Sequence, residues 1–224
     1  MIIDNTYFKG ELYIPHAKPG ITDDVTEVDG AIIDFINEYV VECLIKCLGY
    51  DLYSEFSAVL DKAKPNGLID GSEEKWNQLL NGFSYLDPNS GKTIAWRGIR
   101  HKSAIVGNYD KSFLANYVYY FYEKNDYITR SDSGHQIVKA TNAENVLPNE
   151  KVTRAWNKMV DMIQGSNRSP NYGYKNGMPY VDYFNQNNQE VPLSKFIKDS
   201  NATLDGTYAN YNPYVFSKLN AFGL

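Results

Sequence analysis

The side chains that could do chemistry are few in this sequence and widely separated. The three histidines, His16, His101 and His135, lie in three different segments that we expect to be loops or turns. Metal sites are commonly built from pairs of ligands one helical turn or one short loop apart, and no His-x-x-x-His or Cys-x-x-Cys spacing occurs here. The histidines therefore predict no metal centre.

The two cysteines, Cys43 and Cys47, are four residues apart on the apolar side of one predicted helix. Adjacent helical turns are a poor place for a disulfide, and two thiols alone make an incomplete zinc site. We expect two buried free thiols, which are typical of a reducing compartment.

Two short patterns match functional motifs only in part. Gly91-Lys92-Thr93 has the end of a phosphate-binding loop but lacks the glycine that the motif needs five residues earlier. Glu73-Glu74 stands at a predicted helix start, where carboxylates complement the helix dipole. We therefore expect no enzyme, no catalytic residue and no cofactor. A hydrolase with two carboxylates stays open as an alternative, because such pairs leave no local pattern.

The net charge of −5 argues against a dedicated nucleic-acid binder, which needs clustered Lys and Arg. Charge is uneven: residues 151–224 hold 8 basic and 5 acidic side chains (+3), which leaves 14 basic and 22 acidic (−8) in residues 1–150. Met1-Ile2-Ile3 is followed at once by Asp4, so we expect no signal peptide. No apolar run approaches the length that spans a membrane.

Two predicted helices and a hairpin between Lys111 and Ile163 organise the chain. One face of the first helix carries Phe113, Leu114, Tyr117, Val118 and Phe121, and one face of the second carries Val152, Ala155, Trp156, Met159, Val160 and Ile163. The regular spacing of the second set predicts that Trp156 lies in the core of a helical bundle.

Strand-forming residues 127–130 and 136–139 flank the turn sequence Ser131-Asp132-Ser133-Gly134, which predicts a β-hairpin near 127–139. A hairpin this short is not stable alone, so it must contact its own helices or another molecule. We expect it to contact a partner through Tyr127, Arg130, Asp132 and His135.

The remaining sequence predicts two arms around this helical domain. Residues 1–24 are broken by proline and glycine and form an N-terminal arm along the body or a neighbour. Residues 25–163 form the helical domain, whose longest helix spans about 25–48. We also expect a short helix after Ser72 as its N-cap, and a strand at 93–96.

Residues 164–224 form a long C-terminal arm, with one short helical candidate at 191–197. The chain contains 19 Tyr, a residue type that suits binding surfaces. The arm's aromatic residues have no period that would build a second core, so we expect them at a subunit or partner interface: Tyr172, Tyr174, Tyr180, Tyr183, Phe184, Tyr208, Tyr211, Tyr214 and Phe216. The arm is then ordered only in an assembly, and a chain ending at Gln164 still folds. The fold class is mainly α: a small helical bundle with an inserted β-hairpin and a long, irregular, aromatic-rich C-terminal arm.

Five segments together resemble a known family. They are Leu48-Gly49-Tyr50-Asp51-Leu52-Tyr53-Ser54-Glu55-Phe56, Trp96-Arg97-Gly98-Ile99, Ser112-Phe113-Leu114-Ala115-Asn116-Tyr117-Val118-Tyr119-Tyr120, Thr141-Asn142-Ala143-Glu144-Asn145 and Lys151-Val152-Thr153-Arg154-Ala155-Trp156-Asn157-Lys158-Met159-Val160. The series resembles the head–tail connector (adaptor, or head-completion) proteins of tailed phages, and most closely the neck ring proteins of crAss-like phages of gut Bacteroidota. It spans roughly residues 25–163.

The resemblance implies a virion protein that forms a dodecameric ring in the neck, between the portal and the tail. Its partners would be other copies of itself, the portal protein and other neck or tail proteins. Genomic DNA would pass through the ring during packaging and ejection without sequence-specific binding, and no membrane is involved. Before assembly the protein would be in the host cytoplasm. The alternative from another class is a small soluble enzyme or ligand-binding domain in which the C-terminal segment closes a pocket.

Overall fold

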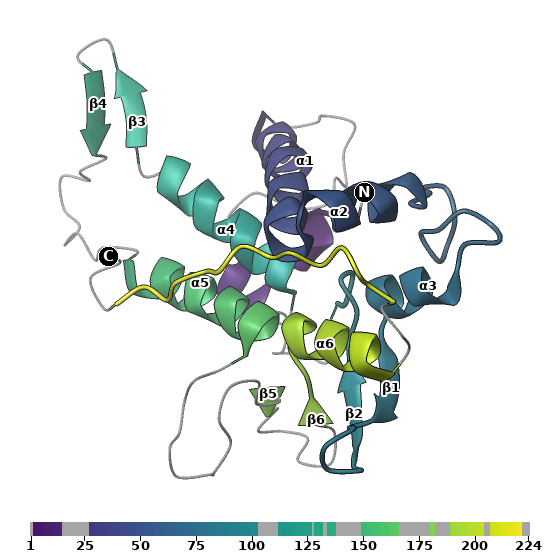
Figure 1. Ribbon diagram of the computed structural model, residues 1–224. Helices are drawn as coiled ribbons and strands as arrows, with labels where there is room; N and C mark the ends of the chain where they lie inside the picture. Colours follow the sequence, from purple (N-terminus) through teal and green to yellow (C-terminus); the bar gives the residue numbers. More distant parts are fainter. Residues whose placement is uncertain are drawn as a thin grey trace.

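The computed structural model describes residues 2–14, 27–102, 112–126, 128–131, 134–137, 149–165, 180–181, 189–203 and 207–220 (Figure 1). The helices of this part are the 3-10 helices η1 (Asn5–Tyr7) and η2 (Gly10–Leu12) and the α-helices α1 (Glu27–Leu48), α2 (Tyr50–Ala58), α3 (Glu74–Asn81), α4 (Phe113–Asp126), α5 (Asn149–Gln164) and α6 (Leu193–Thr203). The strands are β1 (Phe83–Leu86), β2 (Thr93–Trp96), β3 (Ile128–Ser131), β4 (Gly134–Ile137), β5 (Tyr180–Val181) and β6 (Gln189–Glu190).

Helix α4 is the centre of the core. All of its first half, residues 113–120, is buried together with Ser112, and α1 and α5 pack against it. A helix that is apolar on every side must be covered on every side, which explains the nearly uninterrupted apolar sequence here. The exception is Asn116, whose side-chain amide donates to the Ser112 carbonyl at 2.9 Å.

The first residues of the chain also belong to this core. Side chains of the N-terminal stretch that are buried are Ile3, Tyr7, Phe8, Leu12 and Ile14. Helix η1 contacts α1, and η2 contacts α4. The Tyr7 hydroxyl donates to the Arg100 carbonyl at 2.6 Å. The N-terminal stretch therefore lies along the body of its own chain.

A four-stranded sheet in the order β1-β2-β6-β5 lies beside the bundle. β1 and β2 form an antiparallel hairpin, β2 pairs with β6 in parallel, and β6 pairs antiparallel with β5. The strand expected at 93–96 is present as β2. Its Trp96 stacks on Phe196 of α6, with ring centroids 5.8 Å apart, and donates its indole N–H to the Leu79 carbonyl at 3.0 Å.

The chain crosses closely over the end of α3 just after β2. Gly98 has φ +93°, and a Cβ atom there would lie 2.5 Å from the Asn81 carbonyl carbon. Ile99 and Arg100 then donate backbone hydrogen bonds to the carbonyls of Leu79 and Leu80, both at 3.1 Å. Glycine is required because both the positive φ and the close approach exclude a side chain.

The expected β-hairpin is present, and the fold is mainly α with an inserted hairpin, as predicted. β3 and β4 pair antiparallel, with Ser131 opposite Gly134. Among the other elements they contact chiefly α4, whose last turn leads into β3, and they project beyond the helices (Figure 1).

Three expectations from the sequence need correction. Ser72 is not the N-cap of α3, because its hydroxyl donates to the Ile69 carbonyl at 2.5 Å and Glu73 occupies the cap. Trp156 is only half-buried and packs against the C-terminal segment. The C-terminal segment is not an arm without a place in the core, because three α6 residues are completely buried: Leu193, Phe196 and Ile197. A chain ending at Gln164 is therefore not expected to fold.

We expect Phe196→Ala to lower the free energy of unfolding by about 3–5 kcal/mol, because it leaves a cavity between Trp96 and Tyr208. Urea denaturation followed by circular dichroism measures the effect. The matched control is Leu86→Ala, which removes a large apolar side chain that is 66% exposed and should cost under about 1 kcal/mol. Equal effects of the two substitutions would contradict the placement of α6 in the core.

Candidate functional site

The hairpin residues expected at a partner interface are only partly described. Arg130 and His135 are directly opposite each other in the β3–β4 register. Tyr127 and Asp132 lie outside the described residues. The backbone thus places one basic residue and one histidine at the same level of the projecting hairpin.

The expected C-terminal interface residues divide between the core and the surface. Tyr208 and Phe216 are 1% and 4% exposed, so for these two the expectation of a partner interface was wrong. The Tyr208 hydroxyl donates to the Lys75 carbonyl at 2.7 Å, and its ring packs on Trp76 and Phe196. Tyr214, in contrast, is 62% exposed.

The other aromatic residues of this set have mixed positions. The Tyr211 ring is partly buried against the core, and its hydroxyl is enclosed; burial raises its pKa. Tyr180 belongs to β5, opposite Glu190 of β6. Those that lie outside the described residues are Tyr172, Tyr174, Tyr183 and Phe184.

Residues 214–220, called here the C-terminal strap, bind along α5 in an extended conformation (Figure 1). Gln164 contacts the Phe216 backbone twice: its amide donates to the carbonyl at 3.0 Å, and its side-chain oxygen accepts from the N–H at 2.5 Å. Asn157 contacts the Leu219 backbone in the same way, at 3.0 and 2.8 Å. Two side-chain amides thus replace the strand that an extended segment would otherwise pair with.

Trp156 and Asp161 complete the binding of the strap. The Trp156 indole N–H donates to the Ser217 carbonyl at 2.8 Å, and the Trp156 ring contacts Phe216 edge to face. Lys218 forms an ion pair with Asp161. The Trp156 ring is half-buried because it lies at the edge of the bundle, where it packs on Tyr117 and Tyr120 of α4 and on Phe216 of the strap.

A small polar network joins the β1–β2 turn to α6. The Lys195 ammonium contacts Asp87 Oδ1 at 2.9 Å and Asp199 Oδ2 at 2.6 Å, and the Tyr85 hydroxyl donates to Asp199 Oδ2 at 2.9 Å. Burial alone would raise the pKa of Asp87, but hydrogen bonds from Ser90 and Lys195 outweigh it and lower that pKa below its usual 3.8. Burial opposes the charge of Lys195, yet its two carboxylate partners raise its pKa above 10.5.

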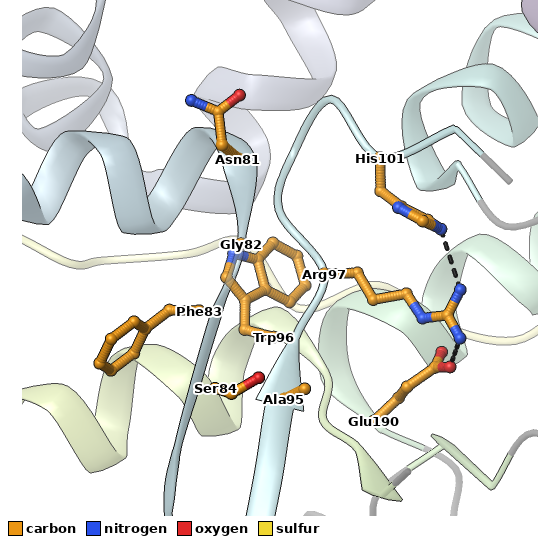
Figure 2. Close-up of a pocket in the computed structure, with 9 residues that line it drawn as sticks. All are labelled: Asn81, Gly82, Phe83, Ser84, Ala95, Trp96, Arg97, His101 and Glu190. Carbon is orange, nitrogen blue, oxygen red and sulfur yellow. Dashed lines mark hydrogen bonds and ion pairs between the residues drawn. The ribbon is translucent and has the colours of Figure 1, made fainter. Parts of the chain in front are cut away.

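A cleft of about 310 Å³ opens where β2 ends, beside β6 (Figure 2). The Arg97 guanidinium lies between two partners: it forms an ion pair with Glu190, which is almost fully buried, and its Nη1 is 2.9 Å from His101 Nε2. Phe83 points away from this group, on the far side of β1 (Figure 2). The Arg97 guanidinium therefore links the end of β2 to Glu190 of β6, and Glu190 compensates its charge.

Cys43 and Cys47 are buried free thiols, as expected, with their sulfur atoms 3.7 Å apart. Burial raises the pKa of Cys43 well above its ordinary value, so this thiol is a poor nucleophile. Within the described ranges there is no group of three or more His, Cys, Asp or Glu side chains that could bind a metal ion. No helix in the same ranges is long and apolar enough to cross a membrane.

Several large apolar side chains are exposed near the strap. Tyr214 and Val215 belong to it, and Val215 is 75% exposed. Tyr50, also well exposed, begins α2 close to the point where Asn212 donates a backbone hydrogen bond to the Leu48 carbonyl. Exposed apolar side chains that gather on one part of a surface are typical of a contact with another macromolecule.

Comparisons with protein families, with curated proteins and with solved structures found no match for this chain.

We expect Lys195→Met to lower the free energy of unfolding by about 2–3 kcal/mol at neutral pH, because Asp87 and Asp199 then face each other without a cation. The loss should shrink at about pH 4, where protonation of a carboxyl relieves the repulsion. Urea titrations at both pH values measure this difference. Lys198→Met, at an exposed α6 position, is the matched control and should have almost no effect.

In the unchanged protein the same network sets two pH limits. The lowered pKa of Asp87 means that its stabilisation is complete above the unfolded value of 3.8 and is lost as the pH falls through the folded value. The raised pKa of Lys195 means that its stabilisation is complete below 10.5 and is lost as the pH rises through its folded value. A loss in Lys195→Met that is as large in acid as at neutral pH would contradict this electrostatic account.

Proposed function

We propose that the chain is a structural virion protein that forms a ring in the neck of a tailed phage. The ring lies between the portal and the tail and joins head to tail around the DNA channel. The observation that carries this proposal is the hairpin β3–β4, which extends from α4 and projects beyond the helices (Figure 1). A hairpin of four residues per strand is not stable in isolation, so a contact outside the bundle fits its position.

The exposed apolar side chains support a repeating contact with other copies. In a ring, one surface of each subunit meets a different surface of the next, and the rotation closes on itself. The projecting hairpin and the surface around Tyr50, Tyr214 and Val215 are two such different surfaces. The resemblance to neck ring proteins supports the same assembly.

The charge of the chain suits a DNA channel. The net charge is −5, and the acidic excess lies in residues 1–150. DNA that has to slide through a ring must not be held by phosphate contacts, whose strength grows with the number of Lys and Arg side chains. A mildly acidic body therefore favours passage over binding.

A second candidate function is supported by the cleft beside β6. In a ligand-binding domain or small enzyme, the C-terminal segment would close this cleft through β6, which carries Glu190. The two functions differ in where the protein is found: a neck protein is part of purified virions, whereas a soluble ligand-binding protein is left behind in the lysate.

The proposed function is tested by shortening the hairpin. We expect replacement of residues 131–135 by Asn-Gly to leave the helix content unchanged, since β3 and β4 pack chiefly on each other and on α4. Incorporation into particles should be lost. Mass spectrometry of purified virions and electron microscopy of their necks measure incorporation, and circular dichroism checks the fold.

The control for this experiment is a pair of substitutions at the exposed positions Pro88 and Asn89 of the β1–β2 turn, which should not reduce incorporation. Full incorporation of the shortened hairpin would contradict its role in assembly. Absence of the unchanged protein from virions would refute the neck function as a whole. A monomer in solution is compatible with the neck function, because this function does not require the ring to form before the subunits bind the portal.

A further inference from the structure

The groove on α5 that holds the C-terminal strap contacts both the backbone and the side chains of this extended segment. Asn157 and Gln164 bind only the backbone groups of Leu219 and Phe216, so these hydrogen bonds do not depend on the side chains at the two positions. Selectivity comes from Phe216, which is buried between Tyr117 and Trp156, and from Lys218, which pairs with Asp161. The groove thus accepts an extended peptide with an aromatic residue followed two positions later by a cation.

The hydrogen bonds of the strap that hold it in place are made with other elements, and the Tyr214 and Phe216 rings contact each other edge to face. No backbone hydrogen bond joins two of its own residues, and its N-terminal end donates only from Tyr214 to the Lys46 carbonyl, at 2.7 Å. The residue before it is Pro213, which has a fixed φ and no N–H to donate. The preceding Asn212 is held firmly, since it donates to the Leu48 carbonyl and lies against Gly49, where a Cβ would come within 2.7 Å of the Asn212 carbonyl oxygen.

The same contacts would form if the strap came from another copy of the chain. Exchange of an identical segment between identical subunits keeps the hydrogen bonds that Trp156, Asn157 and Gln164 form with the strap, and it gives up the bond from Tyr214 to the Lys46 carbonyl beside the pivot. The effective concentration of the strap at the next groove then decides between the two arrangements. In a ring that concentration is set by the distance to the next groove. Between the pivot at Pro213 and the anchor at Phe216, the side chains of Tyr214 and Val215 are exposed, which suits a segment that crosses between two subunits.

We propose that in the assembled ring the C-terminal strap of one copy occupies the α5 groove of its neighbour. This proposal rests on the proposed ring. Asn212 stays on its own subunit and Phe216 enters the neighbour's groove, so the four residue steps from Asn212 to Phe216 have to cross the gap. In extended form they span at most about 13–14 Å, so the neighbour's Phe216 site must lie within this distance of Asn212. The strap then links each subunit to the next, with Phe216 as the buried anchor and Tyr214 and Val215 in the contact between the two bodies.

The test places single cysteines on the two sides of one ion pair. Asp161→Cys marks the groove, and Lys218→Cys marks the strap. Particles are assembled from a mixture of the two single variants and treated with a short bis-maleimide; Cys43 and Cys47 are buried and do not react. We expect a cross-linked dimer of two 25.5 kDa chains that forms only when both variants are present.

Two controls make the result decisive. The double variant, with both cysteines in one chain, shows that the reagent spans the pair, and mixing Asp161→Cys with Lys62→Cys, an exposed position away from the strap, measures random cross-linking. Rings that give a link in the double variant but none between mixed single variants overturn the strap exchange and leave the ring intact. Failure to find any ring overturns both proposals.

Discussion

The complete burial of the first half of α4 is the constraint on which the rest of the structure depends. Residues 113–120 have no exposed face, so one helix must be covered from all directions. Helices α1 and α5 cover two sides, the N-terminal stretch adds η2, and Phe216 of the C-terminal strap contacts Tyr117. The beginning and the end of the described chain are therefore both needed to bury the same element, which makes the helices, the N-terminal stretch and the strap a single cooperative unit.

The parts of the fold with a local signal could be predicted from the sequence. Helices α1, α4 and α5 have a long apolar period, and the hairpin has strand-forming residues around a turn, so their positions were foreseen within a few residues. The four-stranded sheet could not be foreseen. Its strands β5 and β6 have two residues each, and β6 pairs in parallel with β2, which lies far away in the chain. Such pairing is decided by tertiary contacts, which leave no pattern in a short window.

The expectation that all the C-terminal aromatic residues lie at a partner interface was wrong for Tyr208 and Phe216, and the reason is physical. The absence of a period suggests a partner interface, but a segment that crosses several elements fills a different gap at each crossing: Tyr208 packs beside Trp76, and Phe216 beside Trp156. Their spacing follows the elements they cross and has no period of its own. Asn157 and Gln164, which hold the strap, also gave no signal, because amide side chains on a helix are most often solvated.

The motifs that carry the resemblance explain the fold more directly than the function. Gly98 permits the crossing over α3, Gly49 permits the close approach of Asn212, and residues 112–120 form the buried helix. Any chain with this fold would need these residues, whatever it does. Two other features of the molecule are not needed for the fold, and they bear on its function. A bundle alone has no use for a hairpin that projects beyond it, and it gains nothing from Tyr214 and Val215 in water. Burial of both features against another surface would lower the free energy of the subunit, and this is the physical basis for proposing assembly.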